Sequence, residues 1–133
     1  MLSEFITQLQ KELELKEPLG AEGQDAYSLL LDETTKITIT DSSPGFQLSA
    51  KIGYLPTEKV EEFLSYMLRS NLFGQATHNA VLGLDETGAN VTLNFHCKTK
   101  PSFRDFFDAF QDFVNTILFW QEEIKSHPSP NLS

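Results

Sequence analysis

The spacing of apolar residues along the chain predicts three helices and about five strands. Apolar side chains recur every three or four positions in three segments, residues 2–13, 60–71 and 102–124. Five shorter runs are rich in β-branched and aromatic residues and are bounded by turn residues: residues 26–33, 36–41, 45–55, 79–85 and 90–98. The predicted order is α-βββ-α-ββ-α, an α+β fold with three helices on a twisted antiparallel sheet.

The first helix has one apolar face, whereas the first strand carries apolar residues on two. The helix is amphipathic, with Ser3 as a candidate N-cap and with Pro18 and Gly20 closing the segment. Its apolar positions are Leu2, Phe5, Ile6, Leu9 and Leu13. In the first strand, residues 29–31 are three consecutive leucines, so apolar side chains must lie on both faces of that strand.

The third strand shows the alternation of a sheet with one buried face. Its inward positions are predicted to be Phe46, Leu48, Ala50, Ile52 and Tyr54. The last two strands form a hairpin around the segment "DETGA" and share one apolar face, formed by Val91, Leu93, Phe95 and Cys97.

The last helix begins at a capping box and carries most of the aromatic residues. Ser102 and Asp105 have the spacing of that motif. One broad stripe faces the core, formed by Phe103, Phe106, Phe107, Phe110, Phe113, Val114, Ile117, Leu118, Trp120 and Ile124. Phe119 lies on the polar side instead, which makes it a candidate partner contact, and fraying of the helix is the alternative.

Length and composition indicate one domain over residues 1–125 and a disordered tail over residues 126–133. The tail holds two prolines and little apolar surface. The net charge of −9 should repel phosphate backbones and anionic lipid, so nucleic acid is an unsuitable ligand. No apolar run approaches the roughly 18 residues of a membrane span, and no signal peptide is recognisable. The cytosol is the expected compartment.

The chain offers no catalytic or metal-binding constellation, so we expect no enzyme, no cofactor and no metal. His78, His96 and His127 lack metal-ligand spacing. Cys97 lies on the apolar face of its strand, where a buried neutral thiol is expected. The segment "LGLDETGAN" has Ala89 where a calcium loop requires an oxygen ligand, and it is better interpreted as a hairpin turn.

Three stretches together resemble a known family. They are "YLPTEKVEEFLSYMLRSNLFGQAT", "AVLGLDETGANVTLNFH" and the aromatic last helix. In order and content they resemble the class I type III secretion chaperones, the Tir chaperone family, over nearly the whole chain. The resemblance implies a bacterial cytosolic protein that acts without ATP. It also implies a dimer that holds an extended segment of a secreted effector or gatekeeper protein and keeps that client secretion-competent.

Two sets of residues are the predicted contacts of such a chaperone. A client segment needs apolar pockets and sheet edges, for which the candidates are Leu2, Phe5, Ile6, Leu9, Leu29 and Leu31, with packing in the chaperone's own core as the alternative. The resemblance assigns dimerisation, with itself or with a related chaperone, to Val60, Phe63, Leu64, Met67, Leu68, Leu82 and Leu84. Some of these must instead anchor the second helix to the sheet.

Two other functions remain open at this point. Secretion chaperones of several kinds also regulate transcription, so the partner could be a transcription factor or an RNA polymerase subunit. A small-ligand domain or enzyme that shares only the fold pattern is the other possibility.

Overall fold

A computed structural model of the protein describes residues 2–15, 19–21, 23, 25–74 and 77–127. Within these residues three helices and six strands follow one another. They are α1 (Leu2–Glu12), β1 (Gly20–Ala21), β2 (Ala26–Leu30), β3 (Lys36–Ser42), β4 (Gly45–Tyr54), α2 (Val60–Phe73), β5 (Val81–Leu84), β6 (Asn90–Cys97) and α3 (Phe103–Lys125). The predicted α+β class and element order are confirmed. The sheet has six strands rather than about five, because β1 is only two residues long and too short to show a period.

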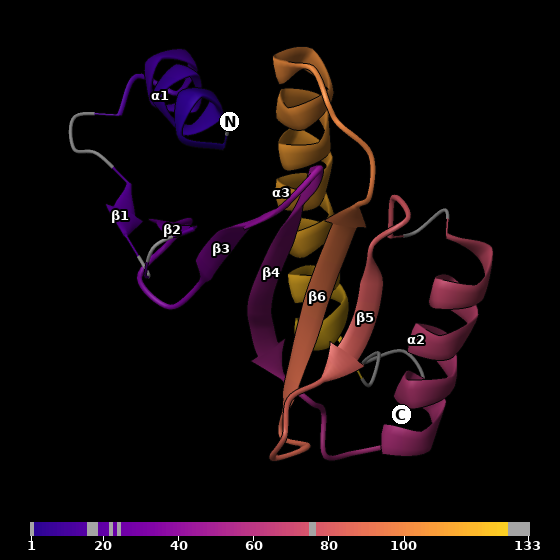
Figure 1. Ribbon diagram of the computed structural model, residues 1–133. Coiled ribbons are helices and arrows are strands. Elements are labelled where there is room, and N and C mark those ends of the chain that lie inside the picture. Colours follow the sequence, from indigo (N-terminus) through magenta and orange to yellow (C-terminus); the bar gives the residue numbers. More distant parts are fainter. Residues whose placement is uncertain (1, 16–18, 22, 24, 75–76, 128–133) are drawn as a thin grey trace.

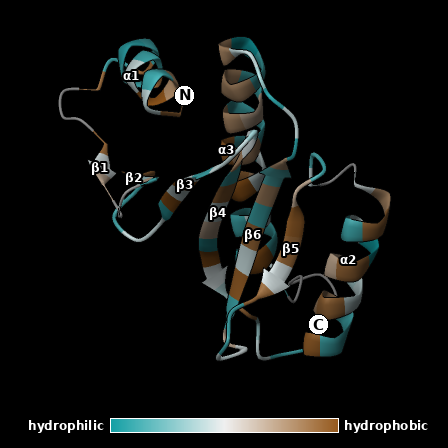
Figure 2. Cartoon of the chain, in the orientation of Figure 1, coloured by the Kyte–Doolittle hydropathy of each residue, from teal (hydrophilic) through white to brown (hydrophobic). Residues whose placement is uncertain are grey.

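The six strands form a single antiparallel sheet in the order β1-β2-β3-β4-β6-β5. Helix α3 crosses behind the sheet in Figure 1, α1 lies near the end that carries β1 and β2, and α2 lies beside β5. Figure 2 shows that strands β3, β4 and β6 alternate between apolar and polar residues. Such alternation is expected of a sheet that is covered on one face only.

The covered face of the sheet packs against the aromatic stripe of α3. Neighbouring strands place Ile39, Leu48 and Phe95 opposite one another in one row across the sheet. The residues of α3 buried in the core are Phe106, Phe110, Phe113, Thr116, Ile117 and Trp120. The capping box is present, since Ser102 Oγ accepts from the Asp105 N–H at 3.0 Å and the Ser102 N–H donates to Asp105 Oδ2 at 3.3 Å. The predicted core-facing stripe is confirmed for every member except Leu118, which is exposed.

A register shift in β4 overturns the prediction for Tyr54. The pairing of β4 with β6 shifts between Lys51 and Gly53, so Ile52 is an extra residue in the ladder. Gly53 then faces α3, where an added Cβ would lie 3.2 Å from Ile124 Cδ1. Tyr54 is turned to the other face and is exposed, because the bulge reverses the alternation beyond it.

The ends of the helices differ in detail from the predictions. Ser3 is not the N-cap of α1, because the helix already includes Leu2. Gly74 ends α2, in a left-handed conformation with φ 74°, and its N–H donates to the Ser70 carbonyl at 2.8 Å. Pro18 and residues 128–133 of the predicted tail lie outside the described residues. His127 packs its ring 5.0 Å from that of Phe63.

Candidate protein-binding surfaces

Most of the predicted client residues of α1 lie in the protein's own core. Leu2, Ile6 and Leu9 are buried. Phe5 is half-buried, and its ring centroid lies 5.3 Å from that of Phe106 and 6.0 Å from that of Phe103. The apolar stripe of α1 thus holds the helix on the aromatic end of α3, and Phe5 alone among the four keeps accessible surface.

Strand β2 carries apolar side chains on both faces, as the three-leucine run predicts. Leu29 is half-buried on the core face, where it pairs with Ile37. Leu30 lies on the opposite face and is exposed. Strand β1 covers only part of the outer edge of β2, since its register pairs Gly20 with Ser28 and Ala21 with Tyr27. Leu31 is half-buried just beyond the strand. The accessible Leu30 was not among the predicted client residues, although the same run contains it.

The predicted dimer residues separate into an inner and an outer group. Phe63, Met67 and Leu82 are buried, and Val60 is half-buried. Leu64, Leu68 and Leu84 are exposed. Helix α2 therefore has two apolar stripes, one packed on its own fold and one facing solvent. A helical wheel drawn from the sequence cannot separate these two stripes. The stripes are adjacent on the helix, and the apolar residues of each recur at the same spacing.

The outer stripe extends farther than predicted. Leu68, Leu72 and Phe73 are 69%, 77% and 73% exposed, and Val81 of the adjacent edge strand is also exposed. Figure 2 shows apolar stretches on both α2 and β5. We name the exposed apolar residues of these two elements the α2–β5 surface: Leu64, Leu68, Leu72, Phe73, Val81 and Leu84. Leu64, Leu68 and Leu72, spaced by four residues, form one exposed ridge on α2, and an exposed apolar ridge of this kind is typical of a protein-binding site.

Asn71 joins the two elements of this surface. Its side-chain Nδ2 donates to the Leu82 carbonyl at 2.8 Å, and the Leu82 N–H donates to its Oδ1 at 2.7 Å. One amide side chain thus fixes the C-terminal half of α2 against the backbone of β5. Asn71 lies within the last turn of α2, before the C-cap Gly74.

Phe119 and Leu118 form a smaller exposed apolar pair on α3. They are 45% and 48% exposed. The position predicted for Phe119, outside the core stripe, is confirmed. The assignment of Leu118 to that stripe is wrong, because the stripe on the wheel is wider than the strip of helix that the sheet covers.

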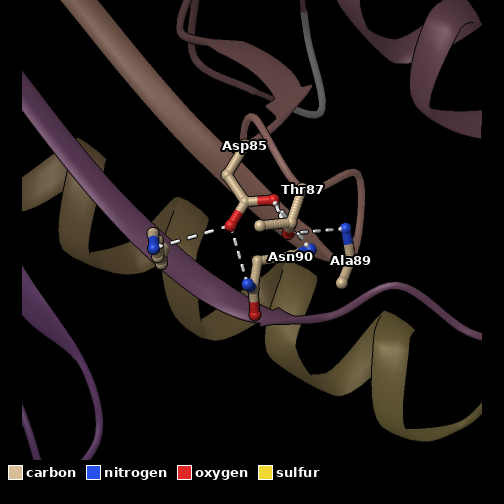
Figure 3. A network of polar contacts seen from close by, with 5 residues as sticks. Asp85, Thr87, Ala89 and Asn90 are labelled. Atoms are coloured by element: carbon tan, nitrogen blue, oxygen red, sulfur yellow. Dashed lines mark hydrogen bonds and ion pairs between the residues drawn. The ribbon is translucent and has the colours of Figure 1, made fainter.

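The β5–β6 hairpin is held by the network in Figure 3. Asp85 accepts hydrogen bonds from the Thr87 hydroxyl and from Asn90 Nδ2, both at 2.7 Å, and lies 3.5 Å from Lys51 Nζ. Its side chain is only 3% exposed. These hydrogen bonds, with that of Thr87 the strongest cause, hold the pKa of Asp85 well below its ordinary value. The segment "LGLDETGAN" is therefore a hairpin turn whose carboxylate is already satisfied.

Metal-binding and membrane-spanning features were sought among the described residues. No group of three His, Cys, Asp or Glu residues among them is arranged to hold a metal ion. Cys97 is half-buried, and its thiol donates to the Thr99 carbonyl at 3.3 Å. None of the helices in the described part of the chain is both long and apolar enough to cross a bilayer.

Comparison with known proteins supports the fold and its extent. The model of the Tir chaperone protein (CesT) family matches residues 4–121. No curated protein matches the chain.

Several solved structures are similar over nearly their whole length. A chain of the ExsC–ExsE complex is 19% identical with a TM-score of 0.69, covering 92% of both chains. A chain of the HopA1–SchA chaperone–effector complex is 16% identical with a TM-score of 0.68, covering 94% of this chain and 93% of the other. The structure of the Yersinia pestis type III secretion chaperone SycH with a fragment of YscM2 contains a similar chain. It is 16% identical with a TM-score of 0.67, and the match covers 89% of this chain and 98% of the other. At these identities the likeness is one of fold.

Proposed function

The chain belongs to the Tir chaperone protein (CesT) family, and from this premise we propose that it binds a secreted effector or gatekeeper protein in the bacterial cytosol and keeps it competent for type III secretion. The family match over residues 4–121 is the observation that carries this function. The similar structures include a chaperone–effector complex and a type III secretion chaperone bound to a protein fragment. Neither the fold nor the comparisons favour a transcription factor or polymerase partner.

The α2–β5 surface supports a dimer. Leu64 and Leu72 lie four positions before and after Leu68, so the exposed ridge is symmetric about its centre. A two-fold axis through Leu68 would place that residue against its own copy, and Leu64 of one protomer against Leu72 of the other. Ridges with spacing of four residues pack with helix axes crossing at about −50°. The ridge is thus suited to a second copy, and a related chaperone with the same ridge is the heterodimeric alternative.

The client surface is narrower than the sequence predicts. Because Leu2, Ile6 and Leu9 are buried in this chain's own core, the proposed contacts are Phe5, Leu29 and Leu31, with Leu30 added. These residues retain accessible surface, and those of β2 lie along an edge that β1 covers only in part. An extended client segment needs such a combination of apolar side chains and sheet edge.

Two measurements test the proposal: identification of the proteins that bind this chain, and a secretion assay of each of them. The tagged protein is isolated from native lysate, the associated proteins are identified, and each is assayed for secretion in cells with and without the chaperone gene. We expect one associated protein to be a type III substrate whose export falls when the chaperone is removed. Leu30→Glu should lower its recovery, whereas Thr40→Glu on the same polar face of the sheet serves as the matched control. Capture of a polymerase component alone, or of a protein whose export is unchanged, would contradict the proposal.

A further inference from the structure

The outer edge of β5 is occupied at Leu82. Strand β5 ends the sheet and pairs with β6 on its inner side, from Val81 opposite Asn94 to Leu84 opposite Val91. The N–H and C=O of Leu82 both bond to Asn71, so both point away from β6. In an antiparallel ladder these are the groups that a further strand would bind.

Asn71 binds these groups as a neighbouring strand would. A carboxamide presents an N–H donor and an oxygen acceptor side by side, as the N–H and C=O of one residue of a facing strand do, and both distances are those of good hydrogen bonds. Ala80, two positions earlier and therefore on the same side of the strand, donates its N–H to the Thr77 carbonyl at 2.9 Å. Two successive outward-facing N–H groups of this edge thus have partners within the chain.

Edge strands with free backbone groups invite pairing with other chains. In this protein the edge groups at Leu82 are satisfied, while the side chains around them are apolar and exposed. The segment "NLFG", residues 71–74, contributes to both features. Asn71 closes the edge, Leu72 and Phe73 are exposed, and Gly74 ends the helix directly after them.

We infer that Asn71, by occupying the backbone N–H and C=O of Leu82, prevents a strand of the second copy or of the client from extending the sheet at that point of β5, so that the second copy docks on the α2–β5 surface by side-chain packing. This inference rests on the dimer proposed above and adds the mode of docking. Asn71 is a positioning residue: it keeps β5 fixed against α2 and directs the partner to the leucine ridge.

Amide exchange at Leu82 separates this docking mode from strand pairing. Leu68→Glu introduces a charge at the centre of the ridge and should yield monomers. Because the acceptor for the Leu82 N–H lies in the same chain, its exchange rate should stay within about threefold of that in the wild-type dimer. Asn71→Ala removes the acceptor, and exchange at Leu82 should become about tenfold faster, the effect of one hydrogen bond worth ~1.4 kcal/mol. If protection at Leu82 disappears in the Leu68→Glu monomer, a partner strand supplies the acceptor and the inference is wrong.

A peptide tests whether the edge is closed. A fluorescent peptide copying residues 80–85 has the sequence of β5 and can pair with that strand, and its anisotropy is measured with the full chain, with added amide protection in β5 identifying strand addition. We expect binding to Asn71→Ala and none to the wild type or to the control Asn115→Ala on α3. Binding of the peptide at β5 of the wild type, detected as added protection there, would overturn the inference. The comparison of Leu82 exchange between the wild type and Leu68→Glu uses no Asn71 variant. It therefore decides the docking mode even if Asn71→Ala does not fold. If the wild type is monomeric at every concentration, the proposed dimer fails, and the peptide result still decides whether Asn71 closes the edge.

Discussion

The Tyr66 hydroxyl donates a hydrogen bond of 2.5 Å to the Glu123 carboxylate, which joins the middle of α2 to the last turns of α3. The Tyr66 ring also lies 4.8 Å from that of Trp120, and the Phe63 ring meets Trp120 edge-on at 6.1 Å. These contacts fix which side of α2 faces the fold. The opposite side, with Leu64, Leu68 and Leu72, therefore remains exposed.

The pairing of Tyr66 with Glu123 predicts loss of stability at alkaline pH. Burial, followed by the hydrogen bond to Glu123, raises the pKa of Tyr66 to about 12. An unfolded tyrosine ionises near pH ~10, so the folded state holds its proton more tightly. The resulting stability is fully present below pH ~10 and is lost as pH rises towards 12. Urea unfolding from pH 9 to 12 should show this loss, and Tyr66→Phe should show less of it. An identical pH dependence in both proteins would contradict the assignment.

Asp85 predicts a loss of stability in acid. Its pKa is lowered in the folded protein, so the stability that it contributes is present above the ordinary value near ~3.9 and is lost as pH falls below that value. Thermal melts between pH 2 and 6 should therefore show a steeper decline for the wild type than for Asp85→Asn. Asp108→Asn is the control, because Asp108 is exposed and forms a surface ion pair with Arg104 at 3.6 Å. A decline shared equally by the wild type and Asp85→Asn would show that other carboxylates cause it.

The aromatic residues of α3 should respond according to their side of the helix. Phe110 and Phe113 are buried under the sheet, so replacing either with Ala should lower the free energy of unfolding by about 3–5 kcal/mol through lost contacts and a residual cavity. Phe119→Ala should cost less than about 1 kcal/mol. Chemical unfolding measures all three. If Phe119 also contacts a partner, Phe119→Ala should weaken client or dimer affinity in calorimetry without unfolding the protein.

The sequence predicts the elements of this fold better than it predicts their exposed faces. The period of the apolar residues locates the three helices, and the capping box at Ser102 marks the start of α3 within one residue. Periodicity does not distinguish Phe63 from Leu64, which are adjacent on α2 and belong to different stripes. Trp120 and Tyr66 decide between them, through contacts between distant parts of the chain. The bulge at Ile52 and the hydrogen bonds of Asn71 to Leu82 likewise arise from contacts between segments that are distant in the sequence. No local sequence pattern predicts them.

The client surface on β2 gives a second contrast between neighbouring residues. Leu30 is exposed, whereas Leu29 faces the core opposite Ile37. Leu30→Glu should therefore weaken client binding and leave the thermal melt unchanged, since a charge at an exposed position stays hydrated. Leu29→Glu should lower the melting temperature, because it brings a carboxylate to the core face. Co-purification of the client beside melts of the free chaperone compares the two. A strong loss of stability in Leu30→Glu would mean that this leucine serves the fold.

The adjacent residues Met67 and Leu68 provide the sharpest test of the α2–β5 surface. Met67 is 4% exposed and packs inward, whereas Leu68 is 69% exposed at the centre of the ridge. In the proposed dimer the two copies of Leu68 meet on the symmetry axis, so Leu68→Glu would bring two like charges together in an apolar contact. The dimer dissociation constant should rise at least about thirtyfold, the equivalent of ~2 kcal/mol and typical of a central contact. The melting temperature of the monomer should not fall.

Met67→Glu should instead unfold the chain, because it places an unpaired charge in the core. Light scattering over a concentration series, combined with thermal melts, measures both effects. A Leu68→Glu protein with unchanged association would show that partners bind elsewhere.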